Sequence, residues 1–229
     1  MGFTIIEIIG GIFTNSIAII ADALHDLGDS FSLAFSWYLD KYSNKKRTKN
    51  FSYGYKRFSL LSALINSLIL IIGSFFILSK AIPRLLSQEP TNAPGMFFLA
   101  ILGIVVNGTA VLKLKKGNTL NEKVVSWHLL EDVFGWIAIL IVSITNLIIS
   151  LPILDPILAI IFTLVIIFNI FKNLKNIMSI FLQCTSSGLN IEEIEEKIRS
   201  IKDIVSVHDT HIWTMDGNYH VLTTHIVLN

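Results

Sequence analysis

Long apolar runs separated by short polar segments constrain this chain more than any other feature. Five such runs occur, at residues 17–39, 58–82, 96–111, 124–149 and 155–171. An α-helix rises about 1.5 Å per residue, so about 20 apolar residues cross the hydrocarbon core of a bilayer. With 52% hydrophobic and only 15% charged residues, the composition argues against a water-soluble globular domain. The sequence therefore predicts an α-helical membrane protein.

A shorter apolar run at residues 3–13 precedes these five. As a helix it would reach about 16 Å, roughly half of the hydrocarbon core. We expect it to be the second half of a first transmembrane helix whose beginning is absent. A signal peptide would carry a basic region before the run and a small-residue cleavage site after it, and the sequence has neither. The expectation is a six-transmembrane-helix bundle with an incomplete first helix, over residues 1–182.

Lysine and arginine are unevenly distributed among the segments that connect these runs. Residues 41–57 hold seven of them with only Asp40 against them, and a second basic group lies at residues 113–123. The turn at residues 150–152 has no lysine or arginine. Because basic loops of membrane proteins face the cytoplasm, we expect a multi-pass protein of the cell membrane with both termini cytoplasmic. Basic residues in such short clusters do not indicate a nucleic-acid partner.

Two pairs of histidine and aspartate lie in sequence that otherwise reads as membrane-embedded. Residues i, i+3, i+4 and i+7 share a helix face, so the second apolar run carries one polar stripe, made of Asp22, His25, Asp26 and Asp29. The spacing of His25 and Asp29 recurs in His128 and Asp132, at the head of another apolar run. Ionisable residues inside a membrane segment indicate a functional site by default.

The four side chains His25, Asp29, His128 and Asp132 suit a divalent metal ion. Zn²⁺ favours four tetrahedral nitrogen, oxygen or sulfur ligands, and two carboxylates would cancel its charge inside the bilayer. Cys184 is the only cysteine, which excludes a zinc site built from cysteines. The alternative is that each pair only packs between helices, although two matched pairs make that interpretation weaker.

Several other polar residues lie near these four or on apolar helices. Asp22, Asp26 and Glu131 could line the ion path or receive protons, or they could simply accept hydrogen bonds. Glu7 and Asn107 stand alone on apolar helices, and we expect them to be satisfied interior contacts outside the site.

The composition becomes polar after residue 172, and a small second domain is expected at residues 183–229. Asn190 and Glu193 form a capping pair ahead of an amphipathic helix of about twelve residues. Two β-rich runs follow at residues 204–214 and 219–228, joined by Asp216-Gly217, which is a hairpin signal. One helix and one hairpin cannot close a core. We expect a further helix and strand to be missing or supplied by a partner.

A two-residue turn at Asp216-Gly217 would pair His208 with His225, and Trp213 with His220. Side chains directly opposed on two strands have Cβ atoms about 4.5 to 5.5 Å apart, which lets two imidazoles share one ion. A zinc site at His208 and His225 is therefore one interpretation, and two metal-free strand histidines are the other. A three-residue turn would shift the register and undo this pairing.

Taken together, the motifs resemble the cation diffusion facilitator family, in particular its zinc-exporting members. The resemblance covers nearly the whole chain and rests on these segments: Asn15-Ser16-Ile17-Ala18, the stretch from Ala21 to Asp29, Tyr53-Gly54-Tyr55-Lys56-Arg57, His128 with Asp132, Leu154-Asp155-Pro156, and the stretch from Val207 to Trp213. It implies six transmembrane helices, a cytoplasmic ferredoxin-like domain that is only partial here, a homodimer, and export of divalent metal in exchange for protons.

The resemblance maps the transport site onto His25, Asp29, His128 and Asp132, a ligand set associated with zinc. It also implies a cytoplasmic metal site that is similar to the placement of His208 and His225. The sequence departs from the family at a further metal site of some members, where Phe51 and Tyr55 replace histidines. Gln183 occupies the position of an acidic residue that pairs with the basic residue at Arg57 in some members, so coupling of a dimer by that route is not expected.

We therefore expect a proton-coupled antiporter that works by alternating access, with Zn²⁺ as the transported substrate and the lipid bilayer as its environment. An unperturbed imidazole titrates near pH 6.5, so histidine ligands can exchange metal for protons at physiological pH. Two alternatives remain at this point. An intramembrane metal-dependent hydrolase would use similar ligands, but the chain has no His-Glu-x-x-His motif and is not expected to be an enzyme. A truncated, non-transporting membrane subunit is the other.

Overall fold

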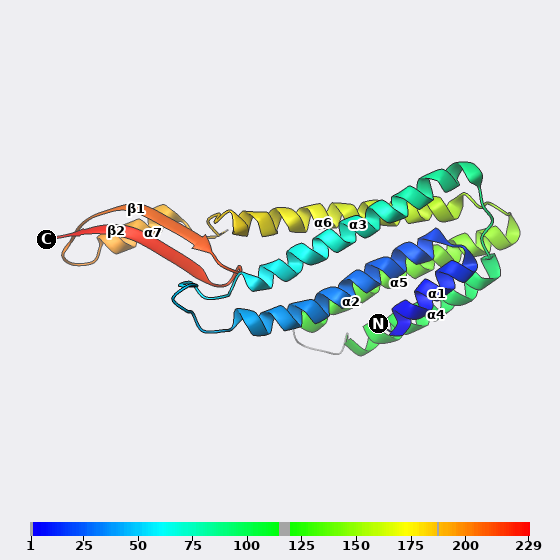
Figure 1. Cartoon of the computed structure of the whole chain (residues 1–229), viewed down its shortest axis with the longest axis horizontal. Coiled ribbons are helices and arrows are strands. Elements are labelled where there is room, and N and C mark those ends of the chain that lie inside the picture. Colours follow the sequence, from blue (N-terminus) through cyan, green and yellow to red (C-terminus); the bar gives the residue numbers. More distant parts are fainter. Residues whose placement is uncertain (1, 115–119, 187) are drawn as a thin grey trace. The chain divides into compact units, whose positions relative to one another are not determined.

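The computed structural model describes residues 2–114, 120–186 and 188–229, without the side chains of residues 120–124 (Figure 1). In this part of the chain, six longer helices come first: α1 (Gly2–Thr14), α2 (Ile17–Ser43), α3 (Phe58–Ser87), α4 (Ala93–Leu114), α5 (Leu120–Ile148) and α6 (Leu154–Phe181). A short helix and two strands follow: α7 (Ile191–Arg199), β1 (Ile204–Thr214) and β2 (His220–Leu228). The centre of the predicted basic segment at residues 113–123 lies outside the described residues.

Four helices of the described residues are long and apolar enough to cross a membrane. They are Phe58–Ser87, Ala93–Leu114, Val125–Ile148 and Leu154–Phe181. α1 is apolar but has only 13 residues. α2 has 27 residues but carries Asp22, Asp26 and Asp29 in its first half, which lowers its apolar character. The protein is thus a helical membrane protein with a small antiparallel sheet, while the expected count of six spans is not confirmed.

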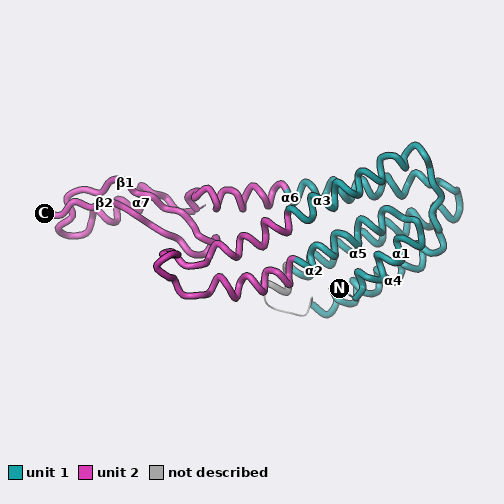
Figure 2. Tube along the Cα trace, viewed as in Figure 1, with its two compact units in different colours: residues 1–31, 68–170 teal, residues 32–67, 171–229 magenta. Residues whose placement is uncertain are grey.

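The chain forms two compact units, which Figure 2 shows in different colours. One unit comprises residues 1–31 and 68–170, and the other comprises residues 32–67 and 171–229. Helices α2, α3 and α6 each contribute residues to both units. The predicted domain boundary at residues 182 and 183 stays a prediction.

The core of the first unit contains Trp136 and Ile139 of α5 together with Met96 and Ala100 of α4, all fully buried. Gly103 of α4 allows this close packing, because a Cβ atom at this position would lie only 2.2 Å from Cδ2 of Trp136. A small residue at a helix contact is typical of membrane bundles, where packing replaces the hydrophobic effect as the driving force between helices.

The start of α2 is held by a carboxylate from the start of α6. Asp155 is fully buried, and its Oδ1 accepts a hydrogen bond from Ser16 Oγ at 2.5 Å. The backbone N–H groups of Ile17 and Ala18 donate to the same carboxylate at 2.8 and 3.4 Å. The first N–H groups of a helix have no partner within the helix, so a carboxylate there is stabilising. Asp155 thereby fixes the helix that carries His25 and Asp29.

The second unit contains α7 and the hairpin of β1 and β2. As predicted, Asn190 caps the helix, and its side chain accepts hydrogen bonds from the backbone N–H groups of Glu192 and Glu193. The helix is shorter than the twelve residues expected, because it ends at Arg199. β1 and β2 pair in the antiparallel direction.

The predicted two-residue turn is wrong. The Met215 N–H donates to the carbonyl oxygen of Tyr219 at 2.7 Å and closes a three-residue loop at residues 216–218, in which Gly217 takes a positive φ of 95°. This longer turn shifts the register, and Trp213 pairs with Val221 instead of His220.

The predicted pairing of His208 with His225 is nevertheless present. A register shift between His208 and His211 inserts one extra residue into β1, and Asp209 there has a φ of 54°. A β-bulge of this kind compensates for the shift that the longer turn introduces.

Candidate metal centre

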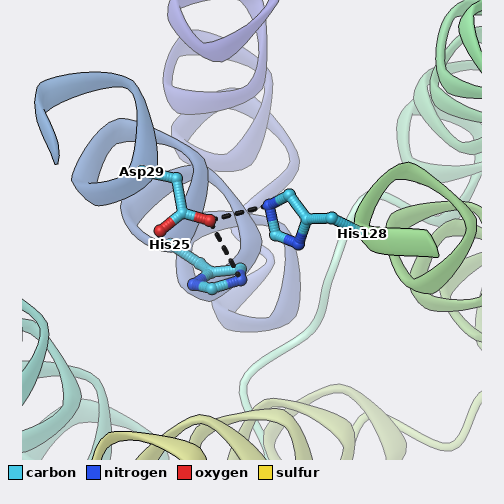
Figure 3. Close-up of side chains that lie close together, drawn as sticks. All are labelled: His25, Asp29 and His128. Atoms are coloured by element: carbon cyan, nitrogen blue, oxygen red, sulfur yellow. Dashed lines mark ion pairs between the residues drawn. The ribbon is translucent and has the colours of Figure 1, made fainter. Parts of the chain in front are cut away.

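Three of the four predicted ligands of the transport site converge in the first unit (Figure 3). His25 and Asp29 lie one turn apart on α2, and His128 projects toward them from α5. One donor atom from each residue lies within 4.8 Å of the others. Among the residues that the structure describes, these three are the group of histidine, cysteine or acidic side chains whose donor atoms lie close enough together to hold a metal ion.

The contacts among these three side chains are short. His128 Nε2 lies 2.7 Å from Asp29 Oδ2, and His25 Nε2 lies 3.7 Å from the same oxygen. The two imidazole rings meet edge to face, with centroids 5.7 Å apart. Tetrahedral Zn²⁺ with bonds of about 2.0–2.2 Å holds its donor atoms about 3.3 Å apart. Side-chain movements of about 1 Å would therefore bring these donors to coordination distance.

Asp132 stands outside this group, although it was predicted as the fourth ligand. It lies four residues after His128 on α5, so the two side chains share a helix face. Asp132 is buried, with 8% of its surface exposed. A buried carboxylate one turn from His128 is placed where a rotamer change or a small rotation of α5 would bring it toward the other three side chains.

The centre borders an apolar cavity of about 490 Å³. His25 is one of its lining residues, and the remainder of the lining comes from α2, α3 and α6, including Phe31, Ile77 and Thr163. The side chains of His25, Asp29 and His128 are 24%, 27% and 39% exposed. The donors are therefore accessible to an ion and partly shielded by apolar residues.

Two further carboxylates lie buried in the same unit. Glu7 of α1 is fully buried, and neither of its carboxylate oxygens has a hydrogen-bond partner among the described residues. Asp22 of α2 is 8% exposed, and its Oδ2 likewise has no hydrogen-bond partner among the described residues. Glu7 is therefore an interior residue outside the group of His25, Asp29 and His128, as expected, but its carboxylate is not satisfied by hydrogen bonds within the described part of the chain. A lone glutamate in an apolar run was the sequence signal for this buried carboxylate, but the pattern of that run does not indicate which helix the side chain faces.

Asp155 is a residue whose structural role sequence reasoning did not identify. In the sequence, Asp155 is only part of the family motif Leu154-Asp155-Pro156, whereas in the structure its carboxylate accepts hydrogen bonds at the first turn of α2. The polar interruption at Asn15-Ser16 was the available signal, because a serine before an apolar run is a typical helix cap.

The second predicted pair of histidines lies on the hairpin of the other unit. The rings of His208 and His225 meet edge to face with centroids 5.6 Å apart. Asp209 Oδ2 lies 3.8 Å from His225 Nδ1, and Asp209 Oδ1 lies 2.9 Å from His211 Nε2. His225 and Asp209 are largely exposed to solvent. The predicted zinc site at His208 and His225 stays a prediction.

Two family models match, one described as the cation efflux transmembrane domain over residues 1–182 and one as the cation efflux protein cytoplasmic domain over residues 187–229.

Several curated relatives match along nearly the whole chain. The "Cadmium, cobalt and zinc/H(+)-K(+) antiporter" of Bacillus subtilis is 31% identical, over 100% of this chain and 75% of the relative. The "Metal cation efflux system protein CzcD" of Cupriavidus metallidurans is 29% identical, over 98% and 72%. The "Zinc transporter ZitB" of Escherichia coli is 28% identical, over 98% and 73%. The chain therefore belongs to the cation efflux family, the cation diffusion facilitators that its motifs resemble.

Proposed function

We propose that this protein exports Zn²⁺ and related divalent cations, and that it exchanges them for protons by alternating access. The observation that carries the proposal is the convergence of His25, Asp29 and His128 from two helices of a membrane protein. Similarity to relatives named as zinc transporters and as a cadmium, cobalt and zinc antiporter supports it. The protein is a transporter and not an enzyme, so it is not the intramembrane hydrolase that the ligand types alone left open.

The transport site in this proposal consists of His25, Asp29, His128 and Asp132. Two carboxylates and two neutral imidazoles neutralise a divalent cation, which avoids the large solvation penalty of a net charge inside the bilayer. Asp132 joins the other three when the ion binds, because it shares a face of α5 with His128. The four N and O donors match the tetrahedral preference of Zn²⁺, while the absence of thiolate ligands disfavours Cu(I).

Exchange for protons supplies the driving force. Moving a divalent cation out of an inside-negative cell costs about 4.6 kcal/mol per 100 mV, at about 2.3 kcal/mol per charge. Imidazole and carboxylate ligands bind metal only when they are deprotonated, so protons that arrive from outside displace the ion. The same groups thus carry metal in one direction and protons in the other.

The membrane arrangement follows from the same proposal. We place α1 and α2 in the bilayer beside the four apolar helices, since α2 carries two of the ligands. Both chain ends lie on the cytoplasmic side of the cell membrane, because the basic segment between α2 and α3 faces that side. The small domain at the C-terminal end associates with a second copy in a homodimer, as its family model for the cytoplasmic domain suggests.

A second zinc ion binds the small domain at His208 and His225. The support is the edge-to-face pairing of the two rings on adjacent strands, with the Asp209 carboxylate 3.8 Å from His225 Nδ1. This site would be occupied by an ion from the cytoplasm and is separate from the transport site.

Transport by reconstituted protein tests the proposal. The purified chain is placed in sealed vesicles and Zn²⁺ movement is followed with an entrapped indicator, with Cd²⁺, Co²⁺ and Mn²⁺ as comparisons. The proposal expects saturable Zn²⁺ movement that depends on Asp29 and Asp132. Metal binding by a wild-type chain that shows no vesicle transport would instead favour the non-transporting subunit.

A further inference from the structure

The end of α2 and the segment that leads to α3 carry a positive charge that takes no part in the proposed binding of the metal ion. We call residues 41–57 the basic loop; its seven cations are Lys41, Lys45, Lys46, Arg47, Lys49, Lys56 and Arg57. Asp40, at its edge, is the only carboxylate close to it in sequence. Lys46, Arg47 and Lys49 are exposed.

The acidic residue at the edge of the basic loop does not neutralise these cations. The carboxylate of Asp40 accepts hydrogen bonds from Ser43 and Asn44, at 3.5 and 3.4 Å. Among the described residues, no ion pair within 4.0 Å involves a cation of the basic loop. Lys45 lies over the ring of Tyr42, at 3.4 Å from its centroid, and Lys56 donates to Asn44 Oδ1 at 2.9 Å. The charge of Lys46, Arg47 and Lys49 is thus available to a partner.

Aromatic side chains hold the basic loop beside the start of a membrane helix. Phe58 is the first residue of α3, which is a candidate span, and its ring lies 5.7 Å from that of Tyr42 near the end of α2. Tyr55 contacts both of these rings, and Phe51 packs on Tyr55 at 4.8 Å. Trp37, five residues before Tyr42 on α2, is 74% exposed.

Tryptophan and tyrosine are enriched where the hydrocarbon core meets the headgroups. An aromatic cluster of this kind at the start of a candidate span would place the cations that follow Tyr42 and precede Phe58 at headgroup level.

We propose that the basic loop is a binding surface for the headgroups of anionic phospholipids in the leaflet that it faces. Three uncompensated cations at headgroup depth complement phosphate groups that carry a net negative charge. Zwitterionic lipids offer no net charge, so they bind this surface less tightly. The proposal does not depend on which metal is transported, nor on whether transport occurs.

Lipid binding by the purified full chain tests this inference. Detergent-solubilised protein is titrated with phosphatidylglycerol, with phosphatidylcholine and with inorganic phosphate, and bound molecules are counted by native mass spectrometry. The wild type is expected to prefer phosphatidylglycerol over phosphatidylcholine. The triple variant Lys46→Gln, Arg47→Gln, Lys49→Gln is expected to bind phosphatidylglycerol about tenfold more weakly, because each cation near an anionic surface contributes to the attraction.

Two matched variants accompany this test. Lys197→Gln, Arg199→Gln, Lys202→Gln removes three charges from exposed positions at and after α7, and it is expected to leave lipid binding unchanged. Lys46→Arg, Arg47→Lys, Lys49→Arg keeps the charge and is expected to keep the affinity. In about 1 M salt the Debye length falls to about 3 Å, so the preference should disappear.

Three results would overturn the inference. The first is equal phosphatidylglycerol affinity for the wild type and the glutamine variant, with helix content and elution volume unchanged. The second is equal binding of the two lipids by the wild type. The third is competition by inorganic phosphate at the same concentration as the lipid, which would assign the surface to soluble anions.

Discussion

His128 of α5 and Asp29 of α2 contact each other through Nε2 and Oδ2, at a distance of 2.7 Å. This contact joins a pair of helices whose ligand motifs lie far apart in the sequence. A protonated imidazole nitrogen donates a hydrogen bond here to the carboxylate, and a metal ion would take the place of that proton between the same two atoms. The geometry therefore lets proton and metal ion compete for one position.

Removal of Asp29 should abolish tight metal binding. Asp29→Ala deletes the oxygen that both histidines approach. Loss of residues that merely support a metal ligand lowers affinity about 10–100-fold, so loss of a ligand is expected to lower Zn²⁺ affinity by at least about 100-fold. Competition with a zinc indicator in detergent measures the change. Glu131→Ala is the comparison, because Glu131 Oε2 lies 4.0 Å from His128 Nδ1 on a side chain that is 75% exposed, so a smaller loss of affinity is expected. An equal loss of affinity in both variants would contradict the assignment.

The carboxylate of Asp155 should be required for stability. Asp155→Ala leaves the Ser16 hydroxyl and the first N–H groups of α2 without their acceptor. Unpaired buried polar groups cost about 1–3 kcal/mol each, so a loss of about 3 kcal/mol or more in the free energy of unfolding is expected. Thermal unfolding in detergent, followed by circular dichroism, measures it. Asp155→Asn keeps one acceptor oxygen and should lose less; equal stability of wild type and alanine variant would refute the capping role.

Gly103 and Gly108 of α4 should respond oppositely to alanine. A Cβ atom at Gly103 would meet the Trp136 ring, whereas nothing lies within 4 Å of a Cβ at Gly108. Overpacking of this kind costs about 1–3 kcal/mol, and a freely placed alanine in a helix is favoured over glycine by about 1 kcal/mol. Unfolding midpoints of the two variants should therefore move down for Gly103→Ala and stay or rise for Gly108→Ala. Equal shifts would show that α4 and α5 pack differently.

His208 and His225 of the small domain should bind a metal ion of their own. The double variant His208→Ala, His225→Ala is expected to bind one Zn²⁺ fewer per chain than the wild type, measured by equilibrium dialysis and elemental analysis. His220→Ala changes a histidine at the start of β2 that hydrogen-bonds Ser186, and its stoichiometry should match the wild type. Unchanged stoichiometry in the double variant would leave these residues as a metal-free strand pair.

Sequence patterns predicted the apolar helices and the pairing of motifs on two of them. Apolar run length and the fixed spacing of residues on a helix depend only on local geometry, which is why His25 and Asp29 could be placed on one face. The prediction that His25 and Asp29 meet His128 rested on the chemistry of a shared ion, since no local rule places two helices side by side.

Other features depended on structure that sequence does not encode locally. The hairpin turn was predicted one residue too short. The bulge at Asp209 restores the pairing of His208 with His225, and the residues of the turn carry no information about this bulge. The contact of Asp155 with the start of α2 and the unpaired oxygens of Glu7 likewise arise only from packing between helices.

The measurement that tests the central claim most directly is Zn²⁺ movement into sealed vesicles under an imposed pH gradient, with wild type, Asp29→Ala and Asp132→Ala compared in one experiment. The account predicts that the wild type moves Zn²⁺ against the direction of proton flow and stops when the gradient is collapsed, and that both variants show no gradient-dependent movement. Zn²⁺ movement that ignores the pH gradient, or that persists at the wild-type rate in both aspartate variants, would contradict it.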